Sequence, residues 1–265
     1  MKRYLAAALL LAGGQPEQPA TTSPDKPAGA APATPRPAST TDTLHVADSL
    51  GRPAGVLRLQ PSTQAAFQQL RDALPLRPSD AVNATDTSDA ALPADGRVQR
   101  QGGLLVLRPA QGPPVTLRPV PSPDGPEGND NTYLYWGSLP AARQWVIDVV
   151  TDEGPAVLLI DQRTGRRTQL LGAPSVSPDG QYLLSACEDV ASGSNPTNLS
   201  LYRCTAAGPQ LVWSRDLANW GPRAARWRDA RHVVLAQAHA DAGGDVQAAT
   251  QLPLTYAELE ILPNP

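Results

Sequence analysis

A tight turn followed by a short apolar strand occurs at least twice in this chain. Ser177-Pro178-Asp179-Gly180 precedes the strand-like Tyr182-Leu183-Leu184-Ser185, and the same four residue types stand at Ser122-Pro123-Asp124-Gly125. A weaker copy follows at Trp227-Arg228-Asp229-Ala230. Proline presets φ, the aspartate side chain bonds nearby backbone amides, and glycine accepts positive φ. We therefore predict that these residues shape turns between strands and have no catalytic role.

The strand associated with the turn recurs at a regular spacing. Tyr133-Leu134-Tyr135-Trp136 aligns with Tyr182 to Ser185 and then with His232-Val233-Val234-Leu235, which are separated by roughly 50 residues. A second strand type, Leu104 to Leu107, recurs at Val157 to Ile160 with a similar spacing. A period of this length with about four strands is typical of propeller blades.

Short apolar runs between turn signals predict a chain made almost wholly of strands. The exception is a helix from about Thr63 to Leu74, capped by Ser62 and ended by Pro75, with residues 75–96 as a polar loop. We expect a hairpin from Leu44–Val46 and Val56–Leu59. Further strands are expected at 98–101, 104–107, 115–117, 132–138, 144–150, 156–161, 168–171, 181–187, 199–205, 210–213, 232–240 and 256–262.

The stretch Pro174 to Leu183 resembles the PD40, or TolB-like, class of WD40-like bacterial β-propeller repeats, and Val157 to Gly165 resembles the strand and turn of the preceding blade. The resemblance implies an all-β fold of WD40/TolB-like propeller-type repeats that displays surfaces to partners. About three four-stranded units are recognisable, with one short N-terminal helix. Because closed propellers usually have at least four blades, an open stack, a sandwich-like roll and a ring completed by dimerisation remain alternatives.

Two further expectations concern how the units are completed. Strands within 98–117 and 232–262 are expected to complete one blade together. The segment 43–75 is the candidate for an additional sheet.

The N-terminus has the pattern of an export signal. Met1-Lys2-Arg3 precedes the apolar run Tyr4 to Ala12 and the small pair Gly13-Gly14. This pattern also resembles a bacterial lipoprotein signal, except that Gly14 stands where the lipid-accepting cysteine would fall. We expect a signal peptide at 1–14 and a disordered Pro/Ala/Thr-rich tether at 15–42.

A single β-rich domain is expected at 43–265, divided into an N-terminal part at 43–96 and the repeats at 97–265. Because of the signal peptide expected at 1–14, we expect the protein outside the cytoplasm, in the periplasm, at the outer membrane or in the extracellular medium. Charged residues make up 18% of the chain, and the formal net charge is −3. No broad positive field is therefore expected for nucleic acid, and membrane contact is expected only through an N-terminal anchor.

Cys187 and Cys204 are the only cysteines in the sequence. In an exported chain such a pair favours a disulfide, with two buried free thiols as the alternative. Weak calcium-loop candidates are Asp124, Glu127 and Asp130, although their spacing favours a solvated loop. His45, His232 and His239 do not have the spacing of zinc ligands, and no cofactor is expected.

Two groups of residues are candidates for function. Asp148, Asp152, Glu153 and Asp161 could meet at one rim, as paired carboxylates do in glycosidases. Trp213, Trp220 and Trp227 lie seven residues apart among several arginines. Of these residues, Trp220, Arg223 and Arg226 are the partner-binding candidates, while Trp213 and Trp227 are expected in the core.

No nucleophile, phosphate-binding or dinucleotide-binding motif is present in the sequence. We therefore expect a non-catalytic, exported and tethered module that binds a protein or another ligand at the cell envelope. An extracytoplasmic hydrolase or carbohydrate-acting domain that uses rim carboxylates is one alternative. A structural subunit of an envelope assembly is the other.

Overall fold

Residues 43–80, 92–120, 131–151, 156–190, 193, 195–239 and 252–261 are described in the computed structural model. The chain divides into two compact parts, Met1–Thr34 and Pro35–Pro265, and all described residues belong to the second part. The expected signal peptide, tether, first Ser-Pro-Asp-Gly turn and calcium-loop residues lie outside these ranges. The helices found within them are too short to span a bilayer.

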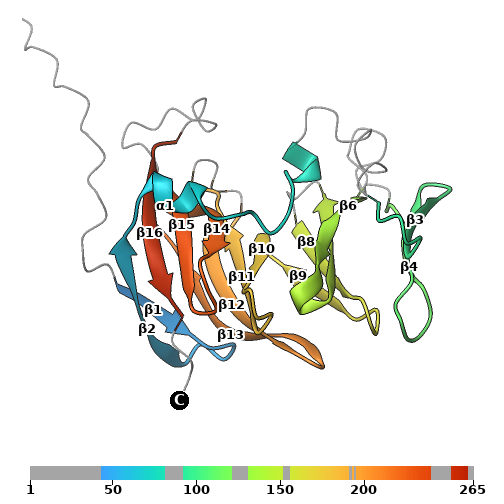
Figure 1. Ribbon diagram of the computed structural model, residues 1–265, viewed down its shortest axis with the longest axis horizontal. Helices are drawn as coiled ribbons and strands as arrows, with labels where there is room; N and C mark the ends of the chain where they lie inside the picture. The colour runs from blue at the N-terminus through green and yellow to red at the C-terminus, as the bar shows by residue number, and fades with distance from the viewer. Residues whose placement is uncertain are drawn as a thin grey trace, which may run out of the picture. The chain divides into compact units, whose positions relative to one another are not determined.

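Two four-stranded antiparallel meanders follow each other in the middle of the chain (Figure 1). The first consists of β6 (Thr132–Leu139), β7 (Gln144–Val150), β8 (Ala156–Asp161) and β9 (Arg167–Leu170). The second consists of β10 (Ala173–Val176), β11 (Tyr182–Cys187), β12 (Asn198–Thr205) and β13 (Gly208–Asp216). In both, each strand pairs with the next strand along the chain, so each is a four-stranded antiparallel unit.

A third unit is completed by the N-terminal hairpin. β14 (Gly221–Trp227), β15 (His232–Ala238) and β16 (Leu254–Glu260) form a meander whose last strand pairs with β2 (Pro53–Pro61). β1 (Thr43–Ala47) pairs with both β2 and β13. The predicted hairpin is therefore confirmed, and it joins the second and third units into one nine-stranded sheet in the order β10-β11-β12-β13-β1-β2-β16-β15-β14.

The strands at 98–117 form a sheet of their own. β3 (Val98–Gln101), β4 (Leu104–Leu107) and β5 (Val115–Leu117) pair only with one another. The expectation that they complete a blade with the C-terminal strands is wrong, because β2 already occupies the free edge of β16. The fold is thus all-β, as expected, with a nearly closed nine-stranded antiparallel sheet and two further sheets.

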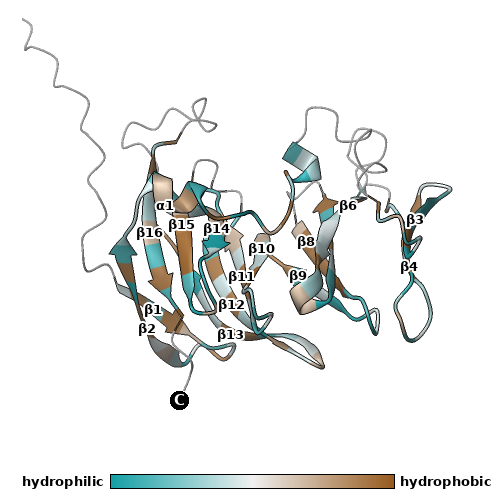
Figure 2. Cartoon of the chain, in the orientation of Figure 1, coloured by the Kyte–Doolittle hydropathy of each residue, from teal (hydrophilic) through white to brown (hydrophobic). Residues whose placement is uncertain are grey.

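Apolar side chains form cores between the three-stranded sheet and the first meander, between the two meanders, and inside the nine-stranded sheet. Figure 2 marks the hydrophobic positions along these strands in brown. Leu105, Leu107 and Leu117 of the three-stranded sheet pack on Tyr135, Trp145, Ile147 and Ile160 of the first meander. The opposite face of that meander packs on Leu183 of the second through Trp136, Val146, Val157 and Leu159. The largest core lies inside the nine-stranded sheet. It takes alternate residues from its strands, including Leu44, Val46, Leu57, Leu59, Leu184, Leu199, Leu201, Trp213, Val233, Leu235 and Leu259.

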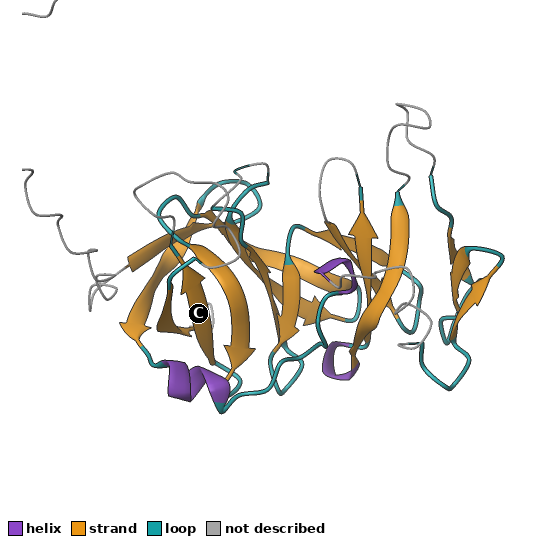
Figure 3. Ribbon diagram, turned by 90° about the horizontal axis from the view of Figure 1, so that it is seen from above, coloured by secondary structure: helices purple, strands orange, loops and turns teal. Residues whose placement is uncertain are grey.

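The two edge strands of the nine-stranded sheet, β10 and β14, lie close together without pairing in a ladder. Figure 3 shows the strands and the few short helices of the molecule from above. At one point Trp227 of β14 donates a hydrogen bond from Nε1 to Oγ of Ser175 in β10, at 3.2 Å. Pro174 and Pro222 stand in these edge strands, and proline cannot donate to a ladder. Neither β10 nor β14 was predicted as a separate strand.

The turn that precedes the second strand of a unit is built in the same way twice. In the β10–β11 turn, Asp179 accepts hydrogen bonds from Ser177 Oγ at 2.6 Å and from the amide of Gln181 at 3.1 Å. In the β14–β15 turn, Asp229 accepts from the amides of Arg231 and His232, at 2.8 and 2.9 Å. The weaker copy of the motif therefore occupies the equivalent position in the fold.

The alignment of the first unit is wrong by one strand. Tyr133–Trp136 belongs to β6, the first strand of its meander, whereas Tyr182–Ser185 belongs to β11, the second of its own. The structural counterpart of the β10–β11 turn in the first unit is the 3-10 turn Pro140–Ala142, followed by Arg143 at φ 53°. That turn carries no Ser-Pro-Asp-Gly, so the sequence motif cannot identify it.

The predicted helix is much shorter than expected. α1 spans Gln64–Gln68, and its N-cap is Thr63, whose Oγ1 accepts the amide of Ala66 at 3.1 Å. Phe67 and Leu70 pack on Val234, Ala236 and Tyr256, whereas Leu74 packs in the core between the first two meanders. A single straight helix could not reach both cores, so the chain leaves the helix after Gln68 and continues as a connecting segment. We call residues 72–80 the crossing segment; it includes the 3-10 turn Pro78–Asp80.

Candidate functional site

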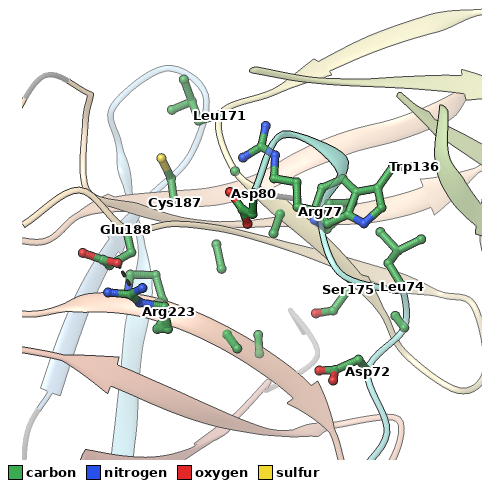
Figure 4. A pocket seen from close by; sticks show the side chains of 18 of the residues that line it. Asp72, Leu74, Arg77, Asp80, Trp136, Leu171, Ser175, Cys187, Glu188 and Arg223 are labelled. Carbon is green, nitrogen blue, oxygen red and sulfur yellow. Dashed lines mark ion pairs between the residues drawn. The ribbon is translucent and has the colours of Figure 1, made fainter. Parts of the chain in front are cut away.

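A cavity of about 700 Å³ lies where the first strands of the three units meet. Its walls are β6, the start of β10, the end of β11, the start of β14 and the crossing segment (Figure 4). A volume of this size lies within the range of small-ligand sites in proteins. The residues that line it include Asp72, Leu76, Arg77, Leu171, Cys187, Glu188 and Arg223.

The crossing segment is fixed to the first meander by a buried ion pair. Asp148 of β7 is fully buried, and Nη2 of Arg77 lies 2.6 Å from its Oδ1. The other carboxylate oxygen accepts the amide of Ser79 at 2.9 Å, and Arg77 also donates to the carbonyl of Ala156 at 3.0 Å. The guanidinium lies 5.3 Å from the ring centre of Trp136. These contacts give one wall of the cavity a fixed position.

The other end of the crossing segment is fixed to the third unit. Asp72 forms an ion pair with Arg226 of β14 at 2.5 Å. Arg226 also donates to the carbonyl of Phe67 at 3.0 Å, and its guanidinium lies 4.1 Å from the ring centre of Phe67. The segment therefore bridges two units across the cavity.

The rim of the cavity carries both charged and apolar groups. Glu188 and Arg223 form an ion pair at 2.9 Å across the space between β11 and β14 (Figure 4). Leu76 and Leu171 are among the exposed large apolar side chains, with 73% and 48% of their surface accessible, and both line the cavity. Exposed apolar groups beside a charged pair suit a ligand that has both apolar and polar parts.

Cys187 also lines this cavity, as a free thiol. Burial raises its pKa, and so do the carboxylates of Asp189 and Glu188, against the opposing charge of Arg77. A raised pKa keeps the group as a thiol at neutral pH, which is unfavourable for a nucleophile.

The predicted disulfide between Cys187 and Cys204 is wrong. Both cysteines are free. Cys187 is the last residue of β11 and Cys204 is the last but one of β12. Because the two strands are antiparallel, the cysteines lie at opposite ends of the pair: Cys187 is opposite Asn198, and the amide of Cys204 bonds the carbonyl of Gln181. Six residues of extended strand separate them, roughly 20 Å, whereas a disulfide requires Cα atoms within about 7 Å.

The partner-binding candidates divide into buried and cavity-facing residues. Trp220 is only 8% exposed and belongs to the core with Trp213 and Trp227, so its ring is buried rather than presented to a partner. Arg223 lies at the cavity rim, and Arg226 holds the crossing segment. The seven-residue spacing of the tryptophans therefore reflects core positions.

The rim carboxylates do not converge where they are described. Asp148 is opposite Val157 and Asp161 is opposite Gln144, so four strand positions, about 13 Å, separate them along β7 and β8. Asp161 shapes the β8–β9 turn by accepting the amides of Arg163 and Thr164, both at 2.9 Å. Asp152 and Glu153 lie outside the described residues.

No group of His, Cys, Asp or Glu suited to a metal ion occurs within the described ranges. His232 contacts Asp229 at 2.9 Å, and His239 contacts Thr255 Oγ1 at 2.6 Å. Burial lowers the pKa of His239. His232 is the first residue of β15, and His239 directly follows its last residue.

Most of the cavity wall was not predicted from the sequence. Residues 72–77 were assigned partly to the helix and partly to a polar loop, and β10 and β14 were not recognised. One signal in the sequence could have indicated these two strands. The turns before β11 and β15 were recognised, and a turn of this kind connects two strands, so a strand is expected before each turn. The buried contact between Arg77 and Asp148 joins residues 71 positions apart and has no local signal.

Comparison with known proteins gives no match to a family model, to a curated protein or to a solved structure.

Proposed function

We propose that this protein is a non-catalytic binding module with propeller-type repeats, exported and tethered at the cell envelope, and that the cavity between the first strands of its units is its binding site. The observation that carries the proposal is the cavity itself. Equivalent strands of three consecutive units converge on it, as the innermost strands of propeller blades converge on a central channel. The crossing segment lines the cavity beside these strands.

The composition of the walls supports binding. The charged groups that fix the walls are neutralised in pairs, Arg77 with Asp148 and Asp72 with Arg226. The exposed Leu76 and Leu171 and the rim pair of Glu188 and Arg223 remain accessible for contact. We infer a ligand with an apolar group next to a polar or charged one, such as a short peptide segment of an envelope protein.

Export and tethering rest on the sequence alone. The positive start, short apolar run and small residues at 1–14 and the proline-rich stretch at 15–42 support them.

A ligand screen with two matched variants tests the proposed site. Leu171 and Val56 are almost equally exposed, at 48% and 47%, but only Leu171 lines this cavity. Purified protein would be screened by thermal shift against a library of short peptides. Ligands that bind the cavity are expected to stabilise the wild type and Val56→Arg and to leave Leu171→Arg unchanged. Hits that stabilise both variants equally, or the absence of any hit, would count against the proposed site.

A further inference from the structure

The arginines of the described domain are unevenly distributed. Six of them surround the β8–β9 turn: Arg97, Arg108, Arg143, Arg163, Arg166 and Arg167; we call these residues the arginine surface. The contacts of the turn connect them. Arg97 donates to the carbonyl of Gln162 at 2.5 Å and to that of Arg108 at 3.2 Å, and the amide of Gln162 bonds the carbonyl of Arg143 at 2.9 Å.

Four of these guanidinium groups donate to carbonyl oxygens, and one of the four, Arg163, also pairs with a carboxylate. Arg163 donates to the carbonyl of Ala206 at 3.1 Å, Arg166 to that of Ala207, and Arg167 to that of Thr116 at 3.4 Å. A carbonyl positions a guanidinium without neutralising its charge, and arginine has five N–H donors. The side chains are therefore held in place with charge and donors to spare.

Few carboxylates face this surface among the described residues. Asp161 is buried and pairs with Arg163 at 3.1 Å. Asp95 accepts the backbone amide of Arg97, and Asp179, in the neighbouring turn, is engaged by Ser177 and Gln181. In the described part of the chain, three carboxylates thus stand against six arginines, although the formal net charge of the whole sequence is −3.

The chemistry of the surface selects among anionic partners. Trp145 lies beneath Arg97, 4.8 Å from its guanidinium, and is buried, so it offers no exposed ring for stacking a nucleobase. The large apolar side chains that are exposed in the described part of the chain, Leu50, Val56, Leu76, Val120, Leu171 and Leu254, do not belong to this surface. It therefore lacks the apolar groups that would enter a bilayer.

We propose that the arginine surface binds an acidic polysaccharide. Planar guanidinium groups match carboxylate, sulfate and phosphate oxygens with paired N–H bonds. A flexible polymer with repeated oxyanions can follow a surface made of turns. The surface lies at the start of β9, whereas Leu171, just after the end of β9, lines the cavity. The two sites are therefore separate, and this inference does not depend on the ligand of the cavity.

Two sets of four substitutions test the proposal. Arg108, Arg143, Arg166 and Arg167 are exposed, and all four would be changed to Gln. The matched control changes Arg58, Arg71, Arg215 and Arg231, also exposed, to Gln and alters the net charge equally. The pair Arg108→Gln and Arg143→Gln removes no side-chain contact of the described structure and serves as a second variant that should fold.

Binding would be measured by biolayer interferometry on dextran sulfate, with uncharged dextran as the blank. We expect the wild type to bind with a Kd that rises with salt, because counterions are released on binding. The variant with all four arginines of the surface changed to Gln is expected to have a Kd at least about tenfold higher than the wild type. The Kd of the control variant is expected to stay within about threefold of the wild-type value. The second variant is expected to be intermediate. Absence of binding at low salt, equal weakening in both sets, or tighter binding to oligo(dT) or phosphatidylglycerol vesicles would overturn the assignment.

Discussion

Asp148, fully buried in β7, accepts a hydrogen bond at 2.8 Å from Nε of Arg77, which comes from the segment that crosses between two units. This contact links residues 71 positions apart in the chain. It fixes the crossing segment, and the segment in turn forms one wall of the cavity. The candidate site therefore depends on a pair that the sequence pattern does not reveal.

Arg77→Ala is expected to lower the free energy of unfolding by about 3–5 kcal/mol, because it leaves a buried carboxylate without its partner. Urea denaturation followed by tryptophan fluorescence measures the change. Arg58→Ala removes an exposed arginine and is expected to change stability by less than about 0.5 kcal/mol. The double variant Arg77→Met/Asp148→Leu should recover much of the loss; a double variant as unstable as Arg77→Ala would contradict the explanation.

Gly180→Ala is expected to be more destabilising than Gly193→Ala. Both glycines have positive φ, at 70° and 64°, so both substitutions carry backbone strain of about 1 kcal/mol. A Cβ at Gly180 would also overlap the carbonyl of Ala141, whereas a Cβ at Gly193 meets nothing within 4 Å. Thermal unfolding of the two variants side by side gives the cost of the contact between the turns. Equal losses would show that the turns are not packed together.

Asp161→Asn is expected to destabilise the protein at neutral pH and to make its stability less dependent on acid. Burial acts to raise the pKa of Asp161, but the hydrogen bonds from Arg163 and Thr164 together outweigh burial and hold it below its ordinary value. The stabilisation is therefore present above the unfolded pKa of about 4 and is lost as pH falls through the folded pKa. Unfolding curves from pH 7 to pH 3 should show the wild type and the variant converging in acid. Asp80→Asn, at an exposed carboxylate, is the control. If the stability of Asp161→Asn changed with pH in parallel with that of the wild type, the proposed role of the Asp161 charge would be refuted.

Both thiols are expected to alkylate without reductant once the chain is denatured, giving a mass increase of two alkyl groups. In the native protein, burial raises the pKa of Cys204 to about 11, with a further contribution from the charge of Asp179. Because the thiolate reacts, the native rate at Cys204 should rise about tenfold for each pH unit between about 8 and 10. Mass spectrometry of tryptic peptides reports both results. If denatured, unreduced protein took up no alkyl group, the result would contradict the free thiols and support a disulfide between Cys187 and Cys204.

Local sequence signals predicted much of the strand structure and little of the site. Runs such as Leu104–Leu107 and Gln144–Val150 match β4 and β7 at both ends, because a largely apolar run between turn residues has few other ways to be buried. The strands β10 and β14 were missed because Pro174 and Pro222 are typical of loops, although proline is tolerated at a sheet edge. The disulfide prediction was wrong because it overlooked strand direction. Two residues near the C-terminal ends of neighbouring antiparallel strands lie at opposite ends of the pair and cannot form a bond.

The net charge of the sequence also did not predict where the charged side chains gather in the fold. A net charge of −3 predicted no positive field, yet Arg97, Arg108 and Arg163 gather around one turn. Their grouping depends on which loops lie side by side, and this arises from the packing of the three-stranded sheet on the first meander.

Titration calorimetry with a peptide selected on the wild type tests the central claim most directly, because it reports both stoichiometry and affinity. We predict one site per chain, an affinity at least about tenfold lower for Leu171→Arg, and an unchanged affinity for Val56→Arg. Equal affinities for the wild type and Leu171→Arg would contradict the claim that the cavity between the three units is the binding site.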